Sequence, residues 1–96
     1  MEKDIENRLV KEVHKRHGKC PKFVSPGTDG MPDRIVLLPG RKIGFVEVKD
    51  PGKKARPLQA SRHRMLRRLG FPTYVLDGKE QIEGILDDIE GSESPQ

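Results

Sequence analysis

Residues 42–49, KIGFVEVK, alternate as a β-strand does, but a glutamate and a lysine stand where the pattern asks for apolar residues. With a period of two, Glu47 and Lys49 share one face of this strand with Ile43 and Phe45. They lie about 7 Å apart along the strand, at ~3.3 Å per residue. A carboxylate beside a lysine fits either an ion pair at an exposed strand edge or a site of phosphodiester hydrolysis.

The preceding strand, residues 34–38, brings a second carboxylate to the pair. Turn residues Pro39 and Gly40 predict an antiparallel hairpin. If the turn centres on Gly40, Asp33 lies directly opposite Glu47, with the Cβ atoms roughly 4.5–5.5 Å apart. A turn on Pro39 and Gly40 alone faces Asp33 against Val46, and a bulge would then have to restore the pair.

Two opposed carboxylates and a lysine are the groups that phosphodiester hydrolysis requires. Like charges directly opposed destabilise a sheet, and a divalent cation would reverse that penalty. Mg²⁺ prefers carboxylate oxygens, keeps several waters and takes phosphate oxygens as further ligands. It acidifies an attacking water and offsets charge on the phosphate, while Lys49 can orient or deprotonate the water or face the phosphate as a fixed cation.

Three more side chains are candidates for the same site. Glu2 and Glu6 are four residues apart on a predicted helix, so both lie on one face and either can reach a metal. Gln59 stands near the start of a basic helix, where it can hold the scissile phosphate or a water. Each of the three is equally compatible with a solvated surface position.

The elements that position these residues follow from hydrophobic periodicity and turn residues. We predict helices over residues 2–17, 58–69 and 79–90, and strands over 22–25, 34–38, 42–49 and 72–76. The order α-β-β-β-α-β-α predicts an α/β (α+β) fold, a mixed sheet flanked by helices. We expect one domain over residues 1–90 and a disordered acidic tail over 91–96.

Packing expectations follow from the same pattern. Gly18 is expected to cap the first helix. The apolar run of residues 34–38 is long enough to be buried on both faces of the sheet. Leu58, Ser61, Met65 and Leu69 share one face of the second helix. The last helix carries an apolar stripe that packs on its own sheet or on a partner: Ile82, Ile85, Leu86 and Ile89.

Charge is distributed unevenly along the chain. The net charge is +4, yet residues 77–96 hold seven acidic residues against one lysine, so the remainder carries +10. We expect the basic residues of the loop and second helix to contact backbone phosphates without reading sequence: Lys53, Lys54, Arg56, Arg62, Arg64, Arg67 and Arg68. His63 is expected to contact phosphate or solvent. With no Trp and one Tyr, base stacking is disfavoured, which favours duplex or branched DNA over single strands.

Several classes of protein are excluded by what the sequence lacks. No apolar run approaches the roughly 18–20 residues of a membrane span, and the charged first residues do not form a signal peptide, so no membrane partner is expected. Cys20 is the only cysteine, which excludes an internal disulfide and predicts a cytoplasmic setting. No glycine-rich stretch has the P-loop pattern, and no nucleotide cofactor is expected.

The motif residues together resemble the VRR-nuclease domain of the PD-(D/E)XK superfamily, over about residues 2–90. The motifs are Gly30-Met31-Pro32-Asp33, Glu47-Val48-Lys49 and Gln59, preceded by a helix with glutamates. The resemblance implies a restriction-endonuclease-like core, dependence on Mg²⁺ or Mn²⁺ and cleavage of structured DNA.

The same resemblance assigns roles to individual residues. It implies that Asp33, Glu47 and the Val48 carbonyl bind the metal, that Lys49 is the catalytic lysine, and that Gln59 is the supporting glutamine of the site. One helix glutamate completes the set; both Glu2 and Glu6 fit, with a slight preference for Glu6.

We therefore predict a metal-dependent, structure-specific DNA endonuclease. We expect a homodimer that resolves four-way (Holliday) junctions, because a two-fold dimer presents two sites related as the junction's strands are. The expected location is the cytoplasm, which is that of a bacterial host if the protein is encoded by a phage. The alternatives are a flap or nicking nuclease acting on other branched DNA, an RNA nuclease using the same site, and a non-catalytic basic DNA-binding protein.

Overall fold

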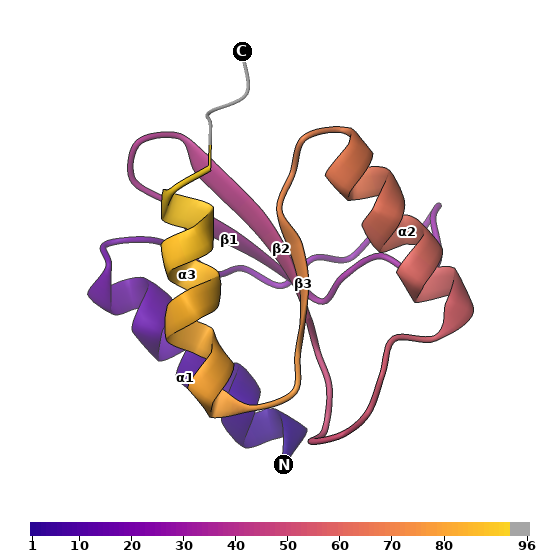
Figure 1. The fold of residues 1–96 in the computed structure, drawn as a ribbon, viewed down its shortest axis with the longest axis horizontal. Coiled ribbons are helices and arrows are strands. Elements are labelled where there is room, and N and C mark those ends of the chain that lie inside the picture. Colours follow the sequence, from indigo (N-terminus) through magenta and orange to yellow (C-terminus); the bar gives the residue numbers. More distant parts are fainter. Residues whose placement is uncertain (93–96) are drawn as a thin grey trace.

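The computed structural model describes residues 1–92 and consists of a three-stranded sheet with helices on both faces (Figure 1). The helices are α1 Glu2–Lys15, α2 Pro57–Arg68 and α3 Ile82–Glu90, with a 3-10 turn, η1, at Lys79–Gln81. The strands are β1 Arg34–Leu38, β2 Lys42–Val48 and β3 Thr73–Leu76. No helix in residues 1–92 is long and apolar enough to cross a membrane.

This order of elements and the mixed α+β class agree with the prediction, with one difference in detail. Residues 22–25 do not form a regular strand; the segment follows the outer edge of β1 through isolated bridges at Lys19 and Lys22. Pro21 lies between the two bridges and has no N–H to donate. Its carbonyl accepts from the Ile35 amide at 3.1 Å, so the pairing is interrupted rather than continuous.

The strand order is β1-β2-β3, with an antiparallel pair followed by a parallel one. The hairpin register runs from Arg34 opposite Val46 to Leu38 opposite Lys42, around a turn centred on Gly40, whose φ is 84°. Of the two registers that the sequence allowed, this is the one that continues with Asp33 opposite Glu47. The Gly40 turn therefore decides which side chains meet at the far end of the hairpin.

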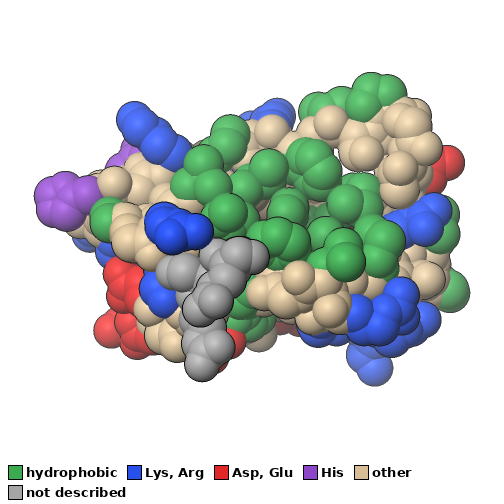
Figure 2. Space-filling model, turned by 90° about the horizontal axis from the view of Figure 1, so that it is seen from above, with side chains coloured by type: hydrophobic (Ala, Val, Ile, Leu, Met, Phe, Trp, Pro, Cys, Tyr) green, Lys and Arg blue, Asp and Glu red, His purple; other side chains and the backbone are tan. Residues whose placement is uncertain are grey.

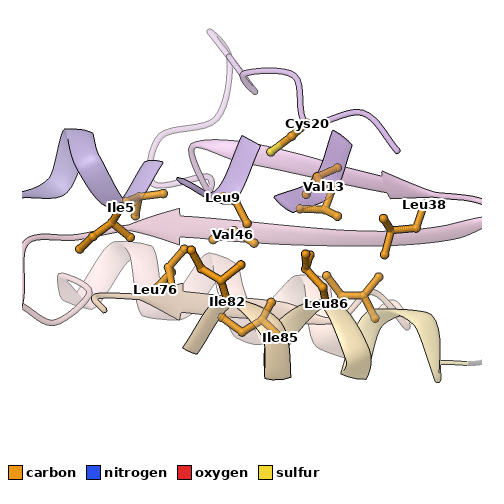
Figure 3. Packing of buried hydrophobic residues seen from close by; sticks show 13 residues of the cluster. Ile5, Leu9, Val13, Cys20, Leu38, Val46, Leu76, Ile82, Ile85 and Leu86 are labelled. Carbon is orange, nitrogen blue, oxygen red and sulfur yellow. The ribbon is translucent and has the colours of Figure 1, made fainter. Parts of the chain in front are cut away.

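One face of the sheet is covered completely, and it holds the hydrophobic core (Figure 3). Helices α1 and α3 lie on this side (Figure 1). Each buried Leu or Ile contributes roughly 1.5–3 kcal/mol relative to exposure. The apolar stripe predicted for the last helix is at most 8% exposed and packs on its own sheet. The buried residues of this core include Ile5, Leu9, Val13, Val36, Leu38, Val46, Val48, Leu76, Ile82, Ile85, Leu86 and Ile89.

Helix α2 lies on the other face of the sheet and covers only part of it (Figure 1). Leu37 of β1 is 39% exposed, so the expectation that this strand is buried on both faces was wrong. The predicted face of the second helix was wrong as well: Leu58 and Leu69 are 46% and 65% exposed. The residues that α2 buries are instead His63 and Leu66.

Helix α1 ends differently from the expected glycine cap. His17, not Gly18, adopts the left-handed conformation, with φ 66°. The His17 amide donates to the His14 carbonyl and the Gly18 amide to the Val13 carbonyl, both at 3.0 Å, which is a Schellman ending. Gly18 is required for a different reason, because a Cβ there would lie 2.3 Å from the Leu37 carbonyl oxygen.

The predicted tail of residues 91–96 is described only in its first two positions. The Gly91 amide donates to the Asp87 carbonyl at 3.0 Å, and Ser92 Oγ donates to the Ile89 carbonyl at 2.7 Å. Both residues therefore belong to the end of α3. The remainder of the predicted tail, residues 93–96, lies outside the described residues.

Gly18→Ala should lower the free energy of unfolding by about 1–3 kcal/mol, because the new methyl group meets backbone that cannot rotate away. Gly84→Ala is the matched control, since a Cβ at this position of α3 would meet no heavy atom within 4 Å beyond the backbone of its own helix. That substitution should instead stabilise the protein by up to about 1 kcal/mol. Urea unfolding measures both, and equal effects of the two substitutions would contradict the close approach at Gly18.

Candidate active site

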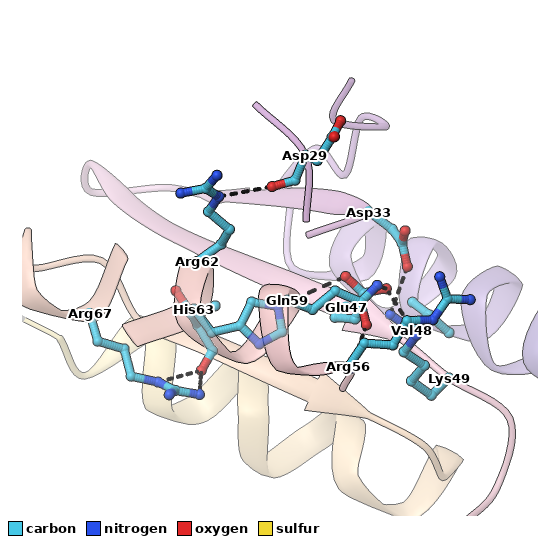
Figure 4. Close-up of polar contacts among 11 residues, drawn as sticks. Asp29, Asp33, Glu47, Val48, Lys49, Arg56, Gln59, Arg62, His63 and Arg67 are labelled. Atoms are coloured by element: carbon cyan, nitrogen blue, oxygen red, sulfur yellow. Dashed lines mark hydrogen bonds and ion pairs between the residues drawn. The ribbon is translucent and has the colours of Figure 1, made fainter. Parts of the chain in front are cut away.

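Glu47 is a carboxylate buried inside the sheet, with only 3% of its surface exposed. Gln59 Nε2 donates to its Oε2 at 3.3 Å, and Lys49 Nζ lies 3.8 Å from the same oxygen (Figure 4). The other oxygen, Oε1, has no hydrogen-bond partner within residues 1–92. Its basic neighbour is His63, whose Nε2 lies 3.8 Å away.

Two unfavourable effects act on the charge of Glu47. Burial raises the pKa of Glu47, and the negative charge of Asp33 raises it further, to about 8 despite the opposing effect of Lys49. Without a cation, this carboxyl therefore retains its proton at neutral pH. A divalent cation placed between the two carboxylates would remove the repulsion and favour the ionised form.

Asp33 is fixed at the end of the hairpin by the neighbouring strand. Its Oδ2 accepts a hydrogen bond from the Val48 amide at 3.0 Å (Figure 4). The N–H and C=O of one strand residue face the same neighbour, so the Val48 carbonyl faces the Asp33 side as well. The structure thus brings Asp33, Glu47 and the Val48 backbone together. Hairpin register predicted the first two as neighbours, and the family resemblance implied the third.

Gln59 is held in place from two sides. Its Oε1 accepts from the Arg56 amide at 2.9 Å, which is the Gln59 half of a capping box at the start of α2. Its Nε2 is thereby directed at Glu47. The helix start and the carboxylate therefore share one side chain, and the orientation of Gln59 follows from the fold of α2.

His63 lies where the sequence did not place it. Rather than contacting phosphate or solvent, it is 1% exposed and packed against the sheet beside Glu47. Burial lowers its pKa, and the positive charges of Arg67 and Lys49 lower it further, so the imidazole is neutral at neutral pH. The sequence signal for this position was the spacing of His63, because a residue four positions after Gln59 lies on the same face of α2.

The two first-helix glutamates have different surroundings. Glu6 pairs with Arg34, whose Nε lies 3.0 Å from Glu6 Oε2 and whose Nη1 donates to the Cys20 carbonyl at 2.8 Å. Glu2 is exposed, and its charge contributes to the raised pKa of Glu47. Both line a hollow of about 200 Å³ together with Asp33, Lys22, Phe23 and Val24.

Arg34 and Asp50 also contribute to the geometry, and sequence reasoning assigned neither a role. Asp50 Oδ1 accepts from the Glu2 amide at 2.6 Å, which ties the start of α1 to the end of β2. Arg34 forms an ion pair with Glu6. An aspartate directly after the strand motif, and an arginine directly after Asp33, were the only sequence signals for these contacts.

The seven predicted phosphate-contacting residues do not all have free side chains. Arg62 Nε donates to the Asp29 carbonyl at 2.8 Å. Arg67 donates twice to the Thr73 carbonyl, at 3.1 and 2.9 Å, which fixes α2 against β3. The remaining members are exposed, and they lie on the loop and on α2: Lys53, Lys54, Arg56, Arg64 and Arg68.

The residues present fit a hard divalent cation. Within residues 1–92, no three His, Cys, Asp or Glu side chains gather tightly enough to hold a metal ion by themselves. Mg²⁺ needs no such cage, since it is usually bound by one or two carboxylates and keeps its other positions for water and phosphate. The opposed Asp33 and Glu47, and the partnerless Oε1, are the donor chemistry that such an ion takes.

The comparisons with known proteins agree with this geometry. No family model matches the chain. A phage protein, "Putative nuclease p44" of Acyrthosiphon pisum secondary endosymbiont phage 1, is 51% identical over 79 residues, which cover 82% of this chain and 85% of the phage protein. A solved structure described as a VRR_NUC domain superposes with a TM-score of 0.84 and 29% identity, covering 90% of this chain and 94% of that one.

The fold is therefore the restriction-endonuclease-like core of the PD-(D/E)XK nucleases. Within that class, the chain belongs to the VRR-nuclease family.

The raised pKa of Glu47 predicts a pH-dependent stability for the protein in EDTA. Between about pH 4.5 and about pH 8 the folded state holds a proton that the unfolded state has released, so the unfolding free energy falls as pH rises through this window. Glu47→Gln should flatten this dependence and raise stability at pH 8.5 relative to the wild type. Urea unfolding at pH 6 and 8.5 tests it, with the exposed Glu83→Gln as the control that leaves the slope unchanged.

Proposed function

We propose that this protein is a metal-dependent DNA endonuclease that uses Mg²⁺ or Mn²⁺. The observation that carries the proposal is the opposed Asp33–Glu47 pair beside Lys49, in a chain of a nuclease family. A buried carboxylate that faces a second carboxylate is costly for a structural protein, and a cation with its phosphate ligand would offset that cost. A phage-type DNA nuclease works in the cytoplasm of the bacterial host, where a lone cysteine stays reduced.

Each residue of the site has a stated task in this reaction. Asp33, Glu47 and the Val48 carbonyl hold the cation, which when bound polarises the phosphate and makes the attacking water more acidic. Lys49 lies on the same strand face as Glu47, where its ammonium orients the water or balances charge on the phosphate. Gln59 holds the Glu47 carboxylate and orients it.

Glu2 is the better candidate for the first-helix ligand. Glu6 is engaged by Arg34 in a partly buried ion pair, and breaking that pair would leave Arg34 without its carboxylate. The Glu2 side chain is exposed, and its charge acts on Glu47. Its backbone is anchored by Asp50, which keeps the glutamate close to the end of β2.

The exposed basic residues hold the DNA backbone next to this centre. Lys53 and Lys54 lie on the loop after β2, which is fixed by two contacts: the Glu2 amide to Asp50 at 2.6 Å, and the Gly52 amide to Asp77 at 3.3 Å. Arg64 and Arg68 extend the positive surface along α2. Contacts of this kind position DNA without reading its sequence and weaken as salt rises.

The proposed substrate is a branched duplex such as a four-way junction, cut by a homodimer. The apolar stripe of α3 cannot form the dimer surface, because it is buried against the sheet. The face that α2 leaves uncovered offers one instead; we call it the apolar sheet face, and Figure 2 shows hydrophobic side chains gathered on the molecule's surface. Its residues are Leu37, Ile43, Phe45, Phe23 and Phe71, with the three rings in successive contact at 5.7 and 5.9 Å.

Asp33→Asn, Glu47→Gln and Lys49→Ala should each lower cleavage of a four-way junction by at least about 10³-fold and leave junction binding within a few-fold. EDTA should abolish cleavage by the wild type, and Mg²⁺ or Mn²⁺ should restore it. Glu6→Gln should retain more activity than Glu2→Gln.

A panel of junction, flap, linear duplex and RNA substrates separates the remaining alternatives. Preference for flaps identifies a flap or nicking nuclease, and cleavage of RNA alone identifies an RNA nuclease. Binding to DNA with no cleavage under any metal condition would leave only the non-catalytic DNA-binding protein.

The apolar sheet face predicts a dimer that a single charge disrupts. The wild type at micromolar concentration should have the mass of a dimer by light scattering, and Leu37→Glu should have that of a monomer, because a charge cannot be buried unpaired in the interface. Leu58→Glu is the matched control, since Leu58 is an exposed leucine on α2 at 46% against 39% for Leu37. A monomeric wild type would refute the dimer and leave the nuclease proposal standing.

A further inference from the structure

Two buried side-chain atoms in residues 1–92 have no hydrogen-bond partner, and they face each other. They are Glu47 Oε1 and His63 Nε2, 3.8 Å apart, on side chains that are 4% and 2% exposed. Leaving one buried polar group unsatisfied costs about 1–3 kcal/mol, so native proteins contain few of them. Two unsatisfied atoms that face each other, one of them on the proposed metal-binding carboxylate, call for a functional explanation.

Helix α2 directs two side chains at this one carboxylate. Gln59 and His63 are separated by one helical turn and lie on the same face. Gln59 Nε2 reaches Oε2 at 3.3 Å, while His63 Nε2 points to Oε1 (Figure 4). Each oxygen of Glu47 therefore faces one nitrogen from α2, and the Gln59 end of this arrangement is already fixed by the Arg56 amide.

We propose that His63 is a positioning residue for Glu47, which it orients by a hydrogen bond from Nε2–H to Oε1 that closes when the site binds its cation. The inference rests on the proposed metal-dependent function. The two atoms are now 3.8 Å apart, and an N–H···O bond of 2.7–3.2 Å requires a movement of only about 0.6–1.1 Å. Groups behind a metal ligand commonly fix its orientation in this manner.

Burial excludes the roles that an exposed histidine could have here. A side chain that is 2% exposed cannot contact a DNA phosphate or exchange protons with solvent directly. His63 therefore acts through Glu47 or serves only to fill space under α2. Leu66, buried one turn further along the same helix, provides the comparison for the space-filling role.

The affinity for Mn²⁺ distinguishes a positioning role of His63 from a packing role. It is measured from the electron paramagnetic resonance signal of free Mn²⁺, at a temperature where every variant is folded. His63→Leu should weaken Mn²⁺ binding about 10–100-fold, the usual cost of removing a group behind a metal ligand. His63→Gln keeps an amide N–H donor and should recover most of this loss. Leu66→Ala should lower the midpoint of urea unfolding yet bind Mn²⁺ as the wild type does.

Nuclear magnetic resonance of ¹⁵N-labelled histidine gives a second readout that is independent of activity. The His63 ring should carry its hydrogen on Nε2, and its Nε2 resonance should move when Mg²⁺ is added to the wild type. In Glu47→Gln, the same addition should leave it unchanged.

Three results would overturn the positioning role while leaving the metal site intact: unchanged Mn²⁺ affinity in His63→Leu, equal losses in His63→Leu and His63→Gln, or a His63 ring protonated on Nδ1. A wild-type protein that binds no Mn²⁺ at all would refute the proposed metal-dependent function itself, and this inference with it.

Discussion

The repulsion between two carboxylates at the open end of the β1–β2 hairpin is the constraint around which the structure is arranged. Register alone places Asp33 against Glu47, and burial then raises the cost of charging Glu47. The surrounding contacts all address this cost. An amide of β2 donates to Asp33, while Gln59 and Lys49 approach Glu47. Even so, Glu47 Oε1 has no hydrogen-bond partner among residues 1–92, so these contacts satisfy only one oxygen of the carboxyl group.

One face of the sheet holds the hydrophobic core, and the other face holds the candidate active site. One face packs against α1 and α3 in a continuous apolar core that contains none of the proposed catalytic side chains. On the other side of the sheet lie Glu47, the residues of α2 that contact it, and the side chains of the apolar sheet face. A small domain can therefore keep a costly polar cluster on one side, because its free energy of folding is supplied by the opposite side.

Much of this arrangement was predictable from local pattern, and the largest failure, the buried face of α2, has a physical origin in the site itself. Period two placed Glu47 and Lys49 correctly, and the turn residues left two hairpin registers open, of which the structure has the one that continues with Asp33 opposite Glu47. The buried face of α2 was not predictable, because periodicity assumes that apolar residues point inward. Here His63 and Gln59 point inward to meet Glu47, and two leucines are left outside. Long-range contacts such as Asp50 with the Glu2 amide carry no local pattern at all.

The parallel pairing of β2 with β3 has a consequence for the order in which the protein assembles. The hairpin that opposes Asp33 and Glu47 is formed by neighbours in sequence, whereas β3 can join β2 only after the whole crossover through α2 has folded back. Closing such a loop carries an entropic cost that local pairing does not, so this step comes late. Gln59 and His63 reach Glu47 only with the crossover in place. A chain still emerging from the ribosome thus holds both carboxylates but lacks the helix that contacts Glu47, and nuclease chemistry waits for the completed fold.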